Sequence, residues 1–192
     1  RNKDGTHTKF RCYSDSQEVI FNNTYKIRKQ NQNAKHSQET RNAMADALCA
    51  ALPKDARVIR IHVSGDMFSH DYFRAWCRVA NRNPEVLFYA YTKSLVYWVA
   101  NRALVPSNLV LTASYGGRDD HLIAEHGLRS AKVVFSKQEA VDLGLEIDND
   151  DSHACDPTKA NQDFALLIHG VQPKGSEAAN ALKILKKEEV TA

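Results

Sequence analysis

Short apolar segments alternate with segments of helical pattern along the chain from residue 57 onward. The apolar segments, which we expect to be strands, are residues 57–63, 85–92, 108–114, 131–136 and 164–170. The segments expected to be helices are residues 70–82, 94–104, 121–127, 137–144 and 177–187. Strands that alternate with helices join through right-handed crossovers and form a parallel sheet. The sequence therefore predicts an α/β fold, built as a parallel sheet of successive βα units.

The expected strands are largely apolar runs, without a regular alternation of polar residues. This pattern is typical of parallel strands that helices cover on both faces. Two architectures remain open at this point, a closed or partial barrel and an open doubly wound sheet.

The first 56 residues have a helical pattern instead. We expect a helix over residues 14–30, a polar spacer, and a helix over 38–52 with Ser37 as its N-cap and Pro53 after its end. A chain of 192 residues is long enough to bury a core within one domain. We expect one α/β domain over residues 1–192, with a helical N-terminal part at 1–56 and five βα units at 57–192.

The composition is that of a globular protein, with 43% hydrophobic and 26% charged residues. No apolar stretch is long enough to cross a bilayer and no signal-peptide pattern is present, so we expect no membrane partner. The cysteines form no compact framework, which favours a reducing compartment and a cytoplasmic protein. They are Cys12, Cys49, Cys77 and Cys155.

Polar residues and glycine follow each expected strand where it ends. The barrel and the doubly wound sheet both place their functional residues at the carboxyl ends of the strands. These residues should therefore share one polar pocket. Each also has a simpler explanation, since Ser64 and Asp66 could cap the next helix and Lys93 could be a solvated loop residue. The candidate binding residues at these ends are Ser64, Gly65, Asp66, Thr92, Lys93, Ser114 and His169.

Metal ligands are a separate hypothesis. His153, Cys155 and His169 could bind zinc, although His-x-Cys lacks the paired spacing of a structural zinc site. A different metal or phosphate enzyme on an open α/β sheet would use His62, Asp66 and His169. The chain contains no P-loop, no GxSxG and no HExxH motif, so those enzyme classes have no support.

Four motifs resemble the phage gene-product-88 family, whose members are carried by bacteriophages and their relatives. They are "RCYSD" at residues 11–15, "HVSGDMFS" at 62–69, "FYAYTKS" at 88–94 and "FALLIHGVQPKGSEAA" at 164–179. For a phage-encoded protein the resemblance implies the host cell cytoplasm. That family in turn resembles radical S-adenosylmethionine proteins, in which a partial (βα)6 barrel holds a [4Fe–4S] cluster on three cysteines.

The resemblance implies roles for particular residues. Cys12 resembles the last cysteine of the cluster loop and would be a metal ligand, with the other two cysteines and the first strand preceding Arg1. Ser64, Gly65 and Asp66 resemble the glycine-rich turn that holds the methionine end of S-adenosylmethionine. Thr92, Lys93 and Ser114 would face cofactor or substrate. The expected fold is therefore a partial (βα)6 barrel that lacks its first strand.

Two classes of function follow. The first is a radical S-adenosylmethionine enzyme, or a degenerate relative, acting on a small-molecule or macromolecular substrate in the strand-end pocket. The alternative is a non-catalytic phage protein that binds nucleic acid or a host protein through the basic segment at residues 25–36. No catalytic residue is assigned from the sequence.

Overall fold

The computed structural model describes residues 10–12, 17–18, 20–36, 41–159 and 161–191. In these residues six strands form one sheet: β1 (Val58–Arg60), β2 (Leu87–Thr92), β3 (Leu109–Ser114), β4 (Ser130–Val134), β5 (Glu146–Ile147) and β6 (Phe164–Leu167). The helices are α2 (Asn22–His36), α3 (Arg41–Ala50), α4 (His70–Arg82), α5 (Leu95–Ala100), α6 (His121–His126), α7 (Lys137–Asp142), α8 (Ser152–Cys155) and α9 (Glu177–Thr191). Two 3-10 helices, η1 (Arg102–Leu104) and η2 (Pro157–Lys159), complete these elements.

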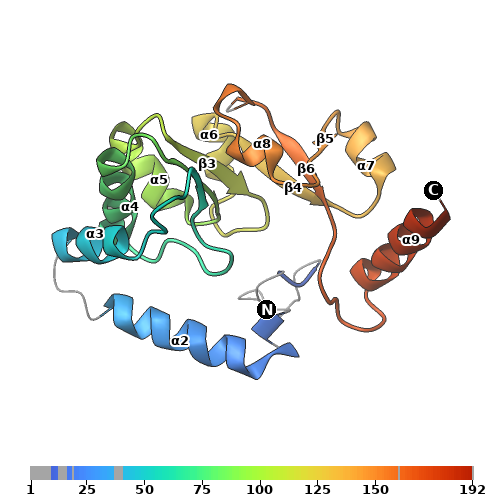
Figure 1. Cartoon of the computed structure of the whole chain (residues 1–192). Helices are drawn as coiled ribbons and strands as arrows, with labels where there is room; N and C mark the ends of the chain where they lie inside the picture. The colour runs from blue at the N-terminus through green and yellow to red at the C-terminus, as the bar shows by residue number, and fades with distance from the viewer. Residues whose placement is uncertain (1–9, 13–16, 19, 37–40, 160, 192) are drawn as a thin grey trace.

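The sheet order is β1-β2-β3-β4-β6-β5, and every neighbouring pair is parallel. From β1 to β4 each strand lies beside the one before it, so the chain winds in one direction (Figure 1). Right-handed crossovers wound in one direction place their helices on one face of the sheet. This confirms the predicted α/β class and parallel sheet. Closure into a partial barrel stays a prediction.

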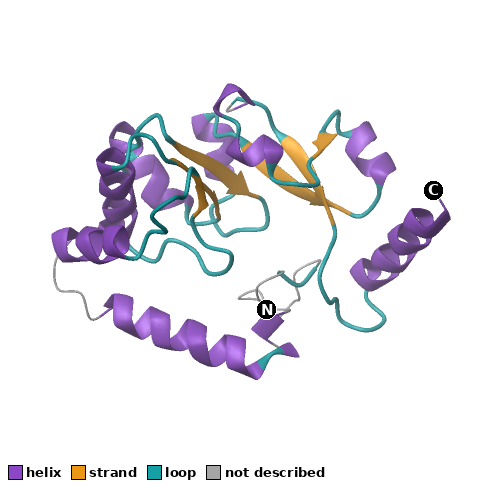
Figure 2. Ribbon diagram, viewed as in Figure 1, coloured by secondary structure: helices purple, strands orange, loops and turns teal. Residues whose placement is uncertain are grey.

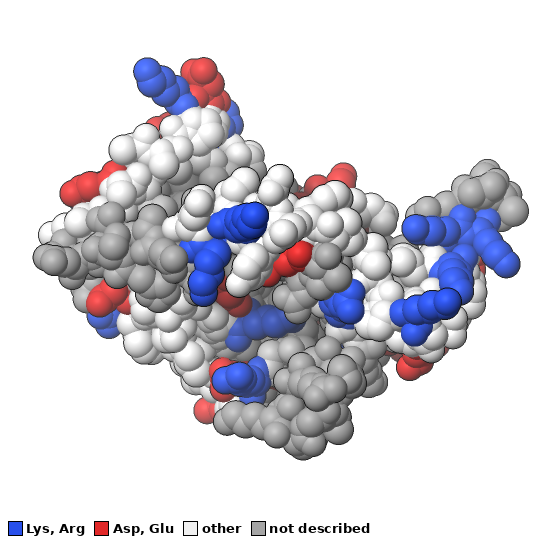
Figure 3. Space-filling view, turned by 90° about the horizontal axis from the view of Figure 1, so that it is seen from below, with Lys and Arg blue, Asp and Glu red and all other residues white. Residues whose placement is uncertain are grey.

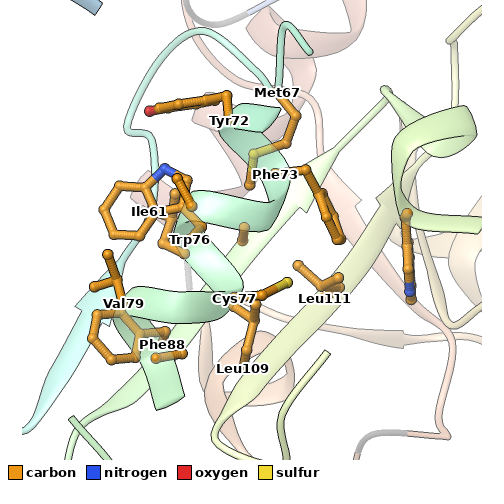
Figure 4. Close-up of a cluster of buried hydrophobic side chains, with 14 of the residues drawn as sticks. Ile61, Met67, Tyr72, Phe73, Trp76, Cys77, Val79, Phe88, Leu109 and Leu111 are labelled. Atoms are coloured by element: carbon orange, nitrogen blue, oxygen red, sulfur yellow. The ribbon is translucent and has the colours of Figure 1, made fainter. Parts of the chain in front are cut away.

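Successive side chains of the central strands point to opposite faces, and the two faces pack against different elements. Phe88, Leu109 and Leu111 pack with residues of α4 and α5 in the largest buried cluster (Figure 4). Tyr89 and Val110, one position along each strand, belong instead to a second cluster that includes Ala154 of α8. The prediction that helices cover the sheet on both faces therefore holds only in part, because the second face is covered by the short α8.

The winding reverses at the edge of the sheet, and this places α8. The chain passes from β4 to β5 at the outer edge and then returns to β6 between them. A right-handed crossover in the reverse direction lies on the opposite face. Accordingly, α8 packs against β2 and β3 on the face that α4 to α6 leave open (Figure 2).

Several predicted boundaries were wrong. β5 lies inside a segment expected to be a loop, and β1 ends at Arg60 where residues 57–63 were expected. α2 continues to His36 through the expected polar spacer. The expected helix over residues 94–104 is divided into α5 and η1. The expected N-cap at Ser37 lies outside the described residues.

α4 supplies most of the buried side chains on the helix-covered face, among them Tyr72, Phe73 and Trp76. Its N-cap is Ser69, whose hydroxyl accepts a hydrogen bond from the Tyr72 amide at 3.1 Å. A side-chain cap of this kind satisfies one of the amide groups that a helix start leaves without a helical partner. No helix in the described part of the chain is both long and apolar enough to span a membrane.

Ser69→Ala should lower the free energy of unfolding by about 1 kcal/mol, because the Tyr72 amide loses its acceptor. Urea unfolding monitored by circular dichroism measures the change. Ser69→Asp, which keeps an acceptor oxygen at the cap, is the matched control and should stay close to the parent. Equal losses in the two variants would contradict the assignment of Ser69 as the cap.

Candidate functional site

A large cavity, of about 1180 Å³, opens at the carboxyl ends of the strands. Its wall combines the strand-end residues Asp66, Lys93 and Ser114 with residues of the segment that leads into α8 and of α9. Leu182, Leu185 and Lys186 are the contribution of α9. The topology therefore brings the predicted strand-end residues other than Ser64 to a common cavity, as expected for parallel strands.

The turn after β1 departs from extended structure at once. His62 has a φ of 65° and Gly65 a φ of 84°, both in the left-handed region. Glycine adopts this conformation at little cost, whereas a residue with a β-carbon is strained there and such strain is frequent at functional sites. The His62 ring contacts the Tyr72 hydroxyl at 2.9 Å and lies against the cavity.

Asp66 joins this turn to the end of β2. Its Oδ1 accepts hydrogen bonds from the Met67 amide at 2.7 Å and the Thr92 hydroxyl at 2.5 Å. Its Oδ2 accepts from the Lys93 amide at 2.7 Å. Asp66 is therefore not a simple helix cap, because it links the turn after β1 to Thr92 at the end of β2, 26 residues further along the chain.

Lys93 continues the link from β2 to the end of β3. Its ammonium donates to the Ser114 hydroxyl at 2.8 Å, to the Ser114 carbonyl at 2.9 Å, and to the Tyr115 carbonyl. Burial lowers the pKa of Lys93, while the nearby Cys12, Asp120 and Asp66 act to raise it. Asp66, Thr92, Lys93 and Ser114 thus form one hydrogen-bonded chain across three strand ends, which we call the strand-end network.

The other predicted site residues lie near this network. Ser64 is half-buried and lines a second cavity beneath the turn after β1. His169 is exposed, lines the large cavity and contacts the Leu167 carbonyl at 2.9 Å. Cys12, the predicted metal ligand, is exposed and lines the same cavity.

The sequence reasoning missed a polar cluster around Asp151 on the second face of the sheet. Tyr89 and Tyr91 donate hydrogen bonds to its two carboxylate oxygens, at 2.9 and 3.0 Å. Arg60 pairs with the same carboxylate at 2.7 Å. Asp151 has a φ of 63°, an uncommon conformation for aspartate. The signal was available, since two tyrosines at alternate positions of one strand point to the same face.

Arg129 and Asp148 hold the segment that carries this cluster. The guanidinium of Arg129 is buried and donates to the carbonyls of His153 and Ala154, at 2.9 and 3.1 Å, and to the Thr112 hydroxyl. The fully buried Asp148 carboxylate accepts from the His153 amide at 3.1 Å. These bonds fix α8 against the sheet and so shape one wall of the large cavity.

Both tyrosines of the Asp151 cluster should ionise late. Burial first, and then the Asp151 carboxylate, raises the pKa of Tyr89 to about 12 and raises the pKa of Tyr91 as well. Because their pKa in the unfolded chain is about 10, their contribution to stability is complete below that pH. It should be lost as the pH rises toward 12.

A phenolate absorbance titration tests this. Of the seven tyrosines, two should ionise only well above pH ~10 while the protein remains folded. In Tyr89→Phe/Tyr91→Phe the late absorbance change should fall by the amount of two phenolates. Ionisation of all tyrosines in one step near pH ~10, before unfolding, would contradict the cluster.

Neither metal hypothesis gains support. His153 is bonded to Glu146 at 2.7 Å, and the Cys155 thiol contacts the Ser152 carbonyl. Within the described ranges no group of three or more His, Cys, Asp or Glu side chains is placed to share a metal ion. The predicted zinc set of His153, Cys155 and His169 is therefore not brought together there.

Fold and cavity define an α/β protein with a polar site at the carboxyl ends of a parallel sheet. A family model described as Gene product 88 matches residues 4–187, and the chain belongs to this family. The match confirms the resemblance to the phage gene-product-88 family that the sequence motifs indicated.

One relative is the Gene 88 protein of Mycobacterium phage L5, which is 50% identical to this chain over 40 residues. The aligned segment covers 21% of this chain and 17% of that protein. No solved structure matches the chain. The family match carries no radical S-adenosylmethionine assignment, so that part of the resemblance stays a prediction.

Proposed function

We propose that the large cavity binds a charged small molecule of the S-adenosylmethionine type, and that the protein is a radical S-adenosylmethionine enzyme or a degenerate relative. The observation that carries the proposal is the position of Asp66. Its carboxylate lies in a left-handed glycine turn at the wall of the cavity, fixed by three hydrogen bonds. Among the described residues Oδ2 accepts only the Lys93 amide, which leaves that oxygen able to accept from a ligand ammonium.

The other members of the strand-end network would position Asp66 in this scheme. Thr92 is 2% exposed and its hydroxyl donates to Asp66, so it orients the carboxylate. Gly65, with open space at the site of a β-carbon, lets a ligand approach the backbone closely. His169 and Arg60, farther along the cavity wall, would face the rest of a ligand.

The described residues alone do not fit a [4Fe–4S] cluster. Such a cluster needs three thiolates, and Cys12 is the one cysteine in the wall of the large cavity as described. Cys49 and Cys77 belong to the buried packing of α3 and α4. The iron-dependent form of the proposal therefore requires further cysteines in the natural sequence preceding Arg1. In the cluster-free form, the protein is a degenerate relative. Family membership supports a phage-encoded protein acting in the host cytoplasm.

The experiment has two arms. Calorimetry of this chain with S-adenosylmethionine tests the ligand, with Asp66→Asn as the variant and Asp55→Asn, at an exposed turn, as the control. We expect binding that Asp66→Asn weakens about tenfold or more, as for loss of a charged hydrogen bond. Equal affinity of the parent and Asp66→Asn, or absence of binding, would overturn the proposal that the cavity binds S-adenosylmethionine through Asp66.

The second arm uses the chain with its natural upstream sequence, reconstituted anaerobically with iron and sulfide. A broad visible absorbance that reduction bleaches supports the enzyme, and a Cys12→Ser variant should lose it. If the longer protein binds S-adenosylmethionine but no iron, the enzyme form is wrong and the degenerate relative is supported.

A further inference from the structure

A second cavity of about 580 Å³ lies between α2 and the turn after β1. It adjoins the large cavity, since His62, Gly65 and Asp66 line both. Its volume is within the roughly 300–1,000 Å³ that small-ligand sites occupy, which is enough for one nucleotide. The proposed ligand of the large cavity does not account for this space.

Aromatic side chains from opposite sides line this second cavity. Tyr25 comes from α2 and is 49% exposed, and Phe68 comes from the turn before α4. Phe21, one helical turn before Tyr25 and on the same side, is 57% exposed. Exposed rings of this kind are the surfaces on which the bases of single strands stack, whatever the sequence.

Positive charge accompanies these rings. Arg28 and Lys29 line the cavity beside Tyr25, and Lys26 is exposed next to it. The sequence of α2 contains four Lys or Arg residues and no Asp or Glu. Figure 3, which views the molecule from the side on which α2 lies, also shows a large group of Lys and Arg side chains where α9 lies. Lys186 of α9 lines the large cavity from that direction.

Two acidic residues, Glu18 and Asp66, line the second cavity. Glu18 pairs with Arg28 at 3.4 Å. The Asp66 carboxylate, on the opposite wall, accepts its three hydrogen bonds from neutral donors, two amides and a hydroxyl. A phosphate near Lys26 and Lys29 would meet the positive charge of α2, beside the ring of Tyr25.

We propose that α2 and the second cavity bind single-stranded nucleic acid, with a base stacked on Tyr25 and phosphates held near Lys26 and Lys29. The aromatic rings favour nucleic acid over an acidic peptide as the ligand. Bases stack on exposed rings, whereas an acidic peptide would bind through the positive charges alone. This inference is independent of the proposed function, because it concerns a different cavity and requires neither iron nor S-adenosylmethionine.

Fluorescence anisotropy of the chain with a labelled oligothymidylate tests the proposal. Binding should weaken roughly sevenfold or more between about 50 and about 200 mM salt, as expected for about two phosphate contacts on a single strand. Tyr25→Ala should weaken binding roughly five- to hundredfold, the range for one stacked base, whereas Tyr25→Phe should bind like the parent.

Charge variants complete the test. Lys29→Gln should weaken binding and reduce the salt dependence, whereas Lys54→Gln, an exposed change on the segment before β1, should leave both unchanged. Tyr25 is half exposed, so its variants should fold, and circular dichroism confirms this. Equal affinities of Tyr25→Ala and Tyr25→Phe, absence of binding, or equally tight binding of a polyglutamate peptide would overturn the proposal.

Discussion

Asp66→Ala is expected to lower the free energy of unfolding by about 3 kcal/mol. The change removes the acceptor of three hydrogen bonds at once, from the Met67 amide, the Thr92 hydroxyl and the Lys93 amide. A hydrogen bond to a charged group contributes about 1.5–3 kcal/mol, and a buried donor that loses its partner costs about 1–3 kcal/mol. Partial exposure of the turn reduces the sum. Thr92, which is 2% exposed, has no access to water as a substitute.

Urea unfolding followed by tryptophan fluorescence measures this loss. Asp66→Asn keeps the shape and one acceptor oxygen and should lose less. Asp55→Ala is the matched control, because Asp55 is exposed in the turn before β1 and should change stability by no more than about 0.5 kcal/mol. If Asp66→Ala were as mild as Asp55→Ala, Asp66 would not link the strand ends.

The second large effect is expected at Arg129. Arg129→Met keeps the length of the side chain but removes every donor, so the carbonyls of His153 and Ala154 and the Thr112 hydroxyl lose their partner. Unpaired buried polar groups cost about 1–3 kcal/mol each, and we expect a total loss of about 3 kcal/mol or more. Burial of the guanidinium is itself unfavourable, and it lowers the pKa of Arg129. Arg129→Met removes this unfavourable burial, which offsets part of the loss in stability.

This loss should be local in its structural effect. Because Arg129 fixes α8 against β3, limited proteolysis of Arg129→Met should cut first within residues 148–159. Arg118→Met, at an exposed position after β3, is the control and should resist as the parent does. Destabilisation without faster cleavage of that segment would show that Arg129 does not hold α8.

The sequence was sufficient for the class of fold and for the grouping of strand-end residues at one cavity. Apolar strands in regular alternation with helices leave few topologies, and parallel strands must bring their carboxyl ends together. For this reason Asp66, Lys93 and Ser114 could be grouped in advance, although they lie far apart in the chain. Their mutual hydrogen bonds were not predicted, because a capping role for Asp66 explains the same residue types.

The reversal of the winding direction at the edge of the sheet could not be predicted from the sequence. β5 has two residues, Glu146 and Ile147, in an acidic segment with turn residues, and so short a strand has no detectable period. Without β5 the return to β6 could not be inferred, and neither could the position of α8 on the open face. The Asp151 cluster depends on that position. The left-handed conformation of His62 could not be predicted either, because glycine is the residue type that usually indicates such a conformation in a sequence.

Side-chain hydrogen bonds join the ends of successive strands at one cavity. A double-mutant cycle of Asp66→Ala and Thr92→Val measures the coupling free energy between the ends of β1 and β2 directly. The geometry predicts a coupling of about 1 kcal/mol or more, because the two side chains share a hydrogen bond of 2.5 Å. If the stability losses of the two single variants add up to that of the double variant within about 0.5 kcal/mol, the two side chains do not interact. That result would contradict the site described for this protein.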